Sequence, residues 1–212
     1  NWGRYLDKDG DGIPYRTIPG NKHPMSAYFT RGTGHDEYAK YTEDSVTFHR
    51  NMERLKKKYE TAKQYLPKPV VHETKGARIG IIAYGSTEAA INEARVQLER
   101  DHGLKTNFLR VRALPLTAEV EEFVAKHDQI YVVEMNRDGQ LHQLLVLANP
   151  ESATKLISVA YGDGLPAAAR WVREGILAKS SNGSKPVAKK SVLKKSNSKP
   201  VAPKKRVAKG AK

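Results

Sequence analysis

The chain has 212 residues, a formal net charge of +14 and no cysteine. The missing cysteines exclude disulfides, thiolate catalysis and any Cys-held iron–sulfur or zinc centre within this chain. No apolar run approaches the roughly 20 residues that span a bilayer, and the N-terminus has no signal-peptide pattern, so we expect a cytoplasmic protein without membrane contact.

The positive charge is concentrated at the C-terminus. Residues 179–212 hold 12 of the 37 basic residues and no acidic one, which leaves 25 basic against 23 acidic residues in residues 1–178. The body therefore lacks the charge of a nucleic-acid-binding surface. In the tail, Ser184–Lys190 returns as Ser198–Lys205. Its Lys/Pro/Ala/Ser composition predicts a disordered segment capable of non-specific contact with polyanions.

Residues 1–20 begin without Met and without a recognisable first element, and we expect them to be the end of a domain that starts upstream. Asp7, Asp9 and Asp11 match the first, third and fifth positions of an EF-hand loop. Ile18, however, stands where that loop needs a bidentate Glu. An Asp/Gly turn is the favoured interpretation, and no metal site is predicted.

The next segment presents an arginine on extended backbone. Ile13–Gly20 contains Pro14 and Pro19, which keep the neighbouring backbone out of helical conformations. Arg16 lies between them, and its guanidinium can bind a carboxylate through two N–H groups. An ordinary surface salt bridge is the alternative interpretation.

Tyr28–Asp44 crowds two glycines, one histidine and four carboxylates into one stretch. Glycines let the backbone turn or approach a ligand, and clustered ionisable groups shift one another's pKa values. A solvated loop that leads into a helix is the alternative. The residues that make this stretch a candidate site are Arg31, Gly34, His35, Asp36 and Glu37.

Ser45–Tyr65 is predicted to be an amphipathic helix. Its apolar residues recur every three or four positions, at Val46, Met52, Leu55, Tyr59 and Ala62. The basic residues fall mostly elsewhere and predict a solvated face or a partner surface. Leu66–Pro69 ends the helix, and Val70–Gly76 is expected to be a linker.

From Ala77 onward, strand and helix patterns alternate. Strands rich in β-branched residues and separated by helices predict an open, mostly parallel α/β sheet with right-handed crossovers and flanking helices. The predicted strands are Arg78–Tyr84, Thr106–Val111, Gln129–Met135 and Lys155–Tyr161. The predicted helices run to about Arg100, from Thr117, over Gln140–Ala148 and over Leu165–Leu177.

The turn after the first predicted strand has one glycine and no GxGxxG, so a dinucleotide site is not expected. A polar cluster follows the third strand, at the edge where open α/β sheets place ligands or partner contacts. Plain turn chemistry explains the same residues equally well. They are Glu134, Asn136, Gly139 and Gln140.

Together the segments resemble the alpha subunit of 2-oxoacid:ferredoxin oxidoreductases, with the 2-oxoglutarate type most similar. In the first half the resemblance rests on Gly12–Gly20, Thr33–Glu37, Tyr41–Asp44 and Asn51–Lys58. The second half, with Tyr84-Gly85-Ser86 and Val133–Gln140, is similar to that subunit's transketolase-like C-terminal domain. The resemblance covers residues 1–178.

The resemblance implies oxidative decarboxylation of a 2-oxoacid to an acyl-CoA, with electrons passed to ferredoxin. Thiamine diphosphate, Mg and an iron–sulfur cluster are then expected in the assembled enzyme. A beta subunit and an absent pyrimidine-binding domain would hold them, and this chain would bind none alone and be inactive alone. The expected partners are the beta subunit, ferredoxin, coenzyme A and the 2-oxoacid.

The resemblance also suggests domains and roles. Residues 1–75 would be the end of the pyrimidine-binding domain with its loop, helix and linker; residues 76–178 would be the transketolase-like domain, and residues 179–212 the disordered tail. Arg16 would contact the substrate carboxylate, and Arg31 and His35 would lie near the active-site entrance or the subunit interface. The other named residues, in both clusters, would organise loops or an interface, and no catalytic residue is expected.

A non-catalytic α/β assembly module with a polyanion-binding tail is the alternative function. The two hypotheses differ in what truncation after Leu177 does, because only the alternative loses its binding activity with the tail.

Overall fold

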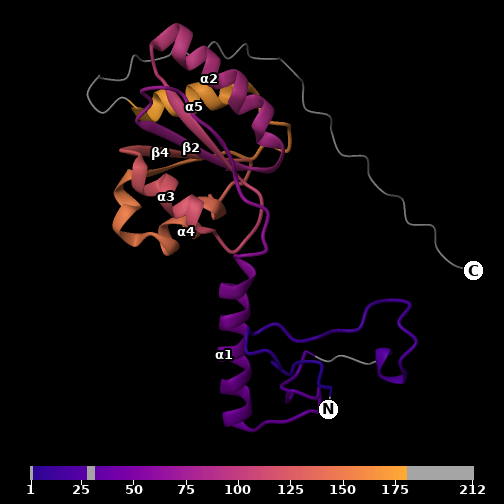
Figure 1. The fold of residues 1–212 in the computed structure, drawn as a ribbon. Helices are drawn as coiled ribbons and strands as arrows, with labels where there is room; N and C mark the ends of the chain where they lie inside the picture. The colour runs from indigo at the N-terminus through magenta and orange to yellow at the C-terminus, as the bar shows by residue number, and fades with distance from the viewer. Residues whose placement is uncertain (1, 28–31, 181–212) are drawn as a thin grey trace, which may run out of the picture. The chain divides into compact units, whose positions relative to one another are not determined.

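The structure is a computed structural model that describes residues 2–27 and 32–180 (Figure 1). Asn1, residues 28–31 and residues 181–212 lie outside the described part. The candidate residue Arg31 and all but the first two residues of the predicted disordered tail, 179–212, therefore fall on residues that are not described. Residues 179 and 180 end the closing helix, so the prediction of disorder is wrong at these two positions. Among the described residues, no helix is both long and apolar enough to cross a membrane.

A five-stranded sheet forms the centre of the second half. Its order is β1-β3-β2-β4-β5, and only β1 runs antiparallel, against β3. This confirms the predicted α/β class with a mostly parallel sheet. The strands are β1 Val70–His72, β2 Ile79–Tyr84, β3 Thr106–Val111, β4 Gln129–Glu134 and β5 Leu156–Ala160.

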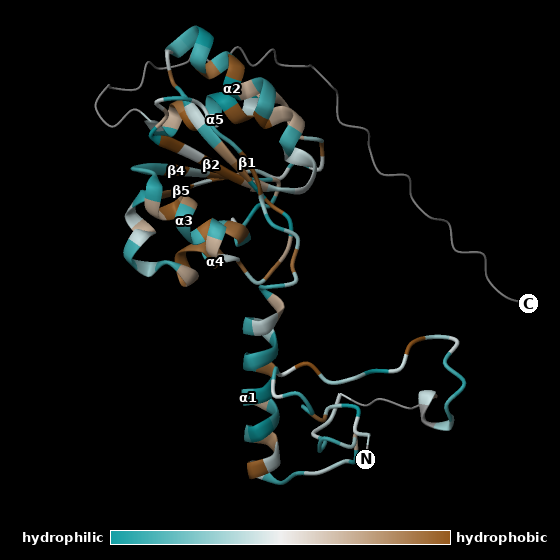
Figure 2. Cartoon of the chain, in the orientation of Figure 1, coloured by the Kyte–Doolittle hydropathy of each residue, from teal (hydrophilic) through white to brown (hydrophobic). Residues whose placement is uncertain are grey.

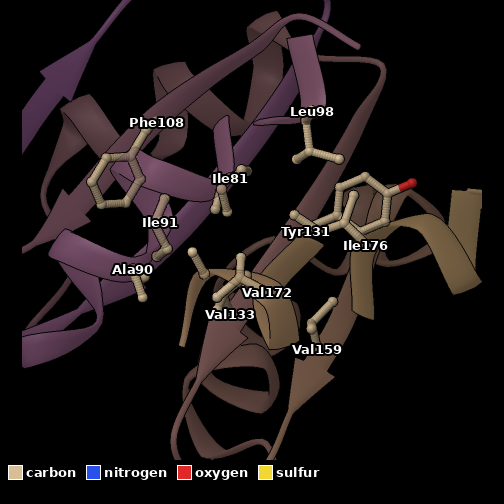
Figure 3. Close-up of a cluster of buried hydrophobic side chains, with 13 residues drawn as sticks. Ile81, Ala90, Ile91, Leu98, Phe108, Tyr131, Val133, Val159, Val172 and Ile176 are labelled. Carbon is tan, nitrogen blue, oxygen red and sulfur yellow. The ribbon is translucent and has the colours of Figure 1, made fainter. Parts of the chain in front are cut away.

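Helices cover both faces of this sheet and make three layers. Helices α2 (Glu88–His102) and α5 (Ala169–Ser180) pack on one face, and α3 (Ala118–Lys126) and α4 (Gln140–Ala148) pack on the other. Alternation along each strand fills both interfaces, since successive side chains point to opposite faces. Figure 3 shows the first interface, in which sheet residues Ile81, Phe108, Tyr131, Val133 and Val159 meet helix residues Ile91, Leu98, Val172 and Ile176.

The first half is built on helix α1 (Ser45–Ala62). Asp44 caps its N-terminus by accepting a hydrogen bond from the Thr47 amide at 2.8 Å. The backbone hydrogen bond keeps the pKa of the Asp44 carboxyl below its usual value. In Figure 2 the strands are mostly hydrophobic, whereas most of α1 is hydrophilic.

The N-terminal segment, residues 2–27, is held to α1 at Asp11 and Gly12 and contains the short 3-10 helix η1 (Pro24–Ser26). Gly12 comes very close to the backbone of α1 and has a backbone φ of +83°. A Cβ there would lie within 2.9 Å of the Lys58 Cα and closer still to the Lys58 backbone nitrogen. Only glycine meets both requirements without strain.

Several boundaries differ from the sequence-based expectation. Helix α1 ends at Ala62 rather than at Tyr65, and the closing helix begins at Ala169 rather than at Leu165. The stretch expected to be a linker contains strand β1, because two β-branched valines followed by His72 suffice to pair with the edge of β3. The 3-10 helices η2 (Gly85–Thr87) and η3 (Pro150–Lys155) complete the elements.

Candidate functional site

Helix α1 binds the rest of the first half through polar side chains. The Asn51 amide donates to the His35 carbonyl at 2.5 Å, Arg54 Nη1 donates to the Gly12 carbonyl at 3.1 Å, and Thr61 Oγ1 donates to the Asp11 carbonyl at 2.5 Å. The spacing places these three donors on one face of the helix. Asn51 is the buried residue of α1, which fits its role of satisfying a backbone carbonyl away from water.

His35 lies in a tight turn that this hydrogen bond anchors. The Tyr5 ring stacks on the imidazole with centroids 3.9 Å apart, and the His35 Nδ1 lies 3.0 Å from the Asp36 carbonyl oxygen. The Asp36 carboxylate accepts the amides of Tyr38 and Lys40 at 2.9 Å each. A Cβ on Gly34 would lie 2.7 Å from the Thr42 carbonyl oxygen. The predicted loop residues are thus brought together by ordinary turn chemistry.

A cleft of about 640 Å³ opens between Tyr5–Asp7 and α1. Glu37 reaches it and forms an ion pair with Arg50 at 2.6 Å. The cleft is lined by Tyr5, Leu6, Asp7, Glu37, Arg50, Asn51, Glu53, Arg54, Lys56, Lys57 and Glu60. The size suits a small ligand or an inserted side chain.

Two buried polar atoms at this cleft lack a partner in the described part of the chain. They are Asp7 Oδ1 and Arg54 Nε. Burial lowers the pKa of Arg54, while the nearby Asp7 and Tyr5 act in the opposite direction. A buried acceptor and a buried donor without partners are costly, so the cleft is suited to a group that offers both a hydrogen-bond donor and an acceptor.

Arg16 lies apart from this cleft. Its segment is held by Thr17, whose hydroxyl accepts from Arg4 Nη2 at 3.0 Å. The Arg16 side chain is exposed, and no hydrogen bond or ion pair with another described residue involves it. No described contact joins Arg16 to His35, so the structure does not bring these two candidate residues together.

The second predicted cluster closes the carboxyl end of β4. Glu134 is fully buried, and its two carboxylate oxygens accept the amides of Leu141 and His142 at 3.0 Å each. A carboxylate is favourable at this position because the N-terminus of α4 carries partial positive charge. Asn136 supports the turn by donating to the Gln140 side chain at 3.0 Å.

Gly139 completes that turn with φ +65°, and a Cβ there would lie 3.0 Å from Ser158 Oγ. The cluster therefore fixes the start of α4 against the sheet. A pocket of about 440 Å³ lies next to it, at the carboxyl ends of β2 and β3. It is lined by Tyr84, Gly85, Val111, Arg112, Ala113, Leu114, Gln140, Leu141 and Leu144.

The described residues do not fit a resident metal or cluster. No group of three His, Asp or Glu side chains among them is placed to hold a metal ion, and the whole sequence has no cysteine for an iron–sulfur cluster. The unpartnered buried atoms of Asp7 and Arg54 can hydrogen-bond a polar ligand.

Sequence reasoning missed the residues that line the first cleft, above all Tyr5, Asp7 and Arg54. A usable signal was present in the helix: Asn51, Arg54, Lys58 and Thr61 recur at spacings of three and four residues. A polar repeat with that spacing marks one helix face as clearly as an apolar repeat does.

By its fold, the chain is a three-layer α/β/α domain that follows a largely hydrophilic helix, α1, with an extended N-terminal segment bound to that helix. No family model matches the chain. A curated relative, subunit alpha of 2-oxoacid:ferredoxin oxidoreductase 2 from Aeropyrum pernix, is 34% identical over 119 residues. The match covers 54% of this chain and 18% of that subunit, so the chain spans under a fifth of the relative's length.

Among solved structures, a 2-oxoglutarate:ferredoxin oxidoreductase from Magnetococcus marinus aligns with a TM-score of 0.66 and 24% identity. The alignment covers 84% of this chain and 30% of that chain. This likeness shows a shared fold. A split-gene transketolase aligns with a TM-score of 0.44 and 21% identity over 52% of this chain and 40% of that chain.

Proposed function

We propose that this chain is part of the alpha subunit of a thiamine-diphosphate-dependent 2-oxoacid:ferredoxin oxidoreductase. The reaction would be the oxidative decarboxylation of 2-oxoglutarate to its acyl-CoA, with electrons passed to ferredoxin in the cytoplasm. The observation that carries the proposal is the 34% identity to a curated alpha subunit over 119 residues. The shared fold with a solved oxidoreductase over 84% of the chain supports it.

In this proposal the two halves have different roles. Residues 1–75 end the pyrimidine-binding domain and border the active site, and residues 76–178 form a transketolase-like C-terminal domain that supports assembly. Thiamine diphosphate, Mg and the iron–sulfur cluster belong to other parts of the assembly, including a beta subunit. The described residues here include no group of three His, Asp or Glu side chains placed to hold a metal ion, and in this proposal the chain performs no reaction step itself.

Arg16 is the proposed contact for the substrate carboxylate. Pro14 and Pro19 hold its backbone extended, and the hydrogen bond from Arg4 to Thr17 fixes the next residue. The guanidinium is exposed and makes no ion pair with a described residue. An exposed guanidinium without an ion-pair partner among the described residues can bind a carboxylate through two N–H groups. His35 and Arg31 are proposed to lie near the active-site entrance or at the subunit interface of the assembled enzyme, apart from Arg16 in this chain.

The first experiment tests the activity. The alpha subunit that contains this sequence is co-expressed with a candidate beta subunit, and 2-oxoglutarate-dependent reduction of ferredoxin or a viologen dye is measured with coenzyme A present. We expect reduction by the pair and none by this chain alone. Absence of 2-oxoacid-dependent reduction in every correctly folded pair would refute the proposal.

The second experiment tests the role of Arg16 within the active pair. Arg16→Ala should raise KM for the 2-oxoacid by about tenfold or more, since a charge-assisted pair contributes about 1.5–3 kcal/mol. KM for coenzyme A should stay unchanged. Lys22→Ala removes another exposed cation from the N-terminal segment and should leave both KM values unchanged. An unchanged 2-oxoacid KM in the Arg16 variant would remove this residue from the site.

A further inference from the structure

Helix α1 carries an apolar stripe that the described chain leaves uncovered. Phe48, Met52, Leu55 and Tyr59 follow one another at spacings of four, three and four residues. Phe48 is 59% exposed, Met52 41% and Tyr59 58%. Leu55 between them is only partly covered. A single exposed apolar residue is ordinary, whereas a continuous row of large ones marks an interaction surface.

The stripe is not the face that α1 turns toward its own chain. The N-terminal segment and the turn at His35 are held by Asn51, Arg54 and Thr61, which lie on a neighbouring polar face. Burial of apolar area is the main force that attaches a helix to a partner. The apolar face of α1 is therefore available for a second, separate contact.

The spacing specifies what kind of element fits the stripe. Alternating intervals of four and three residues average 3.5, which is the repeat of a coiled-coil seam. Ala62 continues the pattern after Tyr59, so the row runs through most of the helix. A row of this length and repeat accepts another α-helix that crosses at a small angle.

The charges beside the stripe specify the chemistry of that helix. At about 100° per residue, Lys56 and Lys63 lie on one flank and Lys58 on the other. Lys63 is paired with Glu60 at 2.9 Å, while no described residue forms an ion pair with Lys56 or Lys58. A second copy of α1 would bring lysines against lysines, and residues 179–212 carry only positive charge. Both are disfavoured by repulsion.

We propose that the stripe Phe48–Met52–Leu55–Tyr59 is a docking surface for an amphipathic helix of a partner protein whose apolar seam is flanked by Asp or Glu. The partner's carboxylates meet Lys56 and Lys58, and its apolar residues cover the four stripe residues. The proposal rests on the surface of α1 alone and goes beyond the proposed activity. The docking proposal can therefore be refuted while the proposed oxidoreductase function holds, and the oxidoreductase function can be refuted while the docking proposal holds.

The experiment uses the full 212-residue chain and synthetic three-heptad peptides as probes. One peptide has Leu or Ile at the seam and Glu at the flanking positions, a second has Lys at those flanks, and a third is a scrambled sequence of the acidic peptide's composition. Binding is followed by fluorescence anisotropy of labelled peptide. We expect the acidic heptad peptide to bind about tenfold or more tightly than the other two.

The variant Phe48→Ser/Tyr59→Ser should weaken the acidic peptide by about 30-fold, as expected when two interface anchors are lost. Val46→Ser is the matched control, because Val46 is 71% exposed and lies about 160° around the same helix from Phe48. Circular dichroism confirms that each variant keeps its helix content. Equal binding by the scrambled peptide would assign the contact to the basic tail and overturn the proposal.

Two further outcomes also overturn the proposal. Unchanged binding by the Phe48/Tyr59 variant would show that the stripe is not the contact. A dimer of the unmodified chain in analytical ultracentrifugation that the same variant converts to a monomer would identify a second copy as the occupant.

Discussion

Gly12 offers a sharp test of how the N-terminal segment is attached to α1. In Gly12→Ala the new methyl group must occupy space already filled by the backbone of Lys58. Backbone atoms of a helix cannot move aside as a flexible side chain can, so we expect the segment to detach locally. Detachment breaks the hydrogen bonds from Arg54 to the Gly12 carbonyl and from Thr61 to the Asp11 carbonyl.

The magnitude follows from these contacts. A left-handed φ costs an alanine about 1 kcal/mol relative to glycine. Each of the two lost hydrogen bonds contributes about 1 kcal/mol. Gly10→Ala is the matched control, because Gly10 has a similar φ of +73° but open space around its Cβ position. The two variants should therefore differ by about 2 kcal/mol in the free energy of local opening.

Hydrogen exchange measured by mass spectrometry reports this difference. Peptides covering residues 3–17 and the centre of α1 should exchange about 30-fold faster in Gly12→Ala than in Gly10→Ala. The α/β half should exchange equally in both variants. Equal exchange of the N-terminal peptides in the two variants would refute the close approach of Gly12 to α1.

Three other substitutions test local contacts in both halves. Glu134→Gln should lower the free energy of urea unfolding by about 2 kcal/mol, because one of the two backbone amides at the start of α4 then faces an NH2 group. The control Glu151→Gln changes an exposed residue and should alter stability by less than about 0.5 kcal/mol. Equal urea midpoints for the two variants would contradict the capping role of Glu134. Asp44→Ala should lower the melting temperature of α1 by circular dichroism at pH 7. The Thr47 amide lowers the pKa of Asp44, so the carboxylate stabilises the helix fully above a pH of about 4, and this stabilisation disappears as the pH falls through the lowered pKa. A difference in melting temperature between Asp44→Ala and the unmodified chain that persists at low pH would contradict this capping role. Gly80→Ala should cost about 1–3 kcal/mol, since its Cβ would lie 2.7 Å from the Phe123 ring, and a second change to a smaller side chain at that phenylalanine should restore stability.

The α/β half was predictable because its signals are local and strong. Strand Thr106–Val111 and helix Gln140–Ala148 have the predicted bounds, since the strand-like stretch of six residues and the helical periodicity end where the elements end. Strand β1 was missed because three residues carry too little periodicity, and its pairing with β3 depends on residues far along the chain. The mostly parallel sheet is therefore confirmed, with an antiparallel edge strand added.

The candidate site was less predictable. Apolar periodicity identified helix α1, but it does not say whether the apolar or the polar face meets the rest of the chain. The structure shows the polar face in contact, through Asn51, Arg54 and Thr61. The cleft beside Tyr5 and Asp7 exists because the polar face of α1 is the one that contacts the N-terminal segment. No local pattern in residues 5–7 predicts it. The binding roles of Arg16 and His35 stay predictions.

Strand β1 has a practical consequence for dividing this chain into fragments. Val70, Val71 and His72 satisfy the outer edge of β3 by antiparallel pairing. A fragment that starts at Ala77 keeps four parallel strands and all four covering helices, yet it leaves the backbone of β3 unpaired at that edge. Unpaired strand edges recruit other chains and lead to aggregation. A fragment that starts at Pro67 retains the edge strand and is the one expected to remain monodisperse.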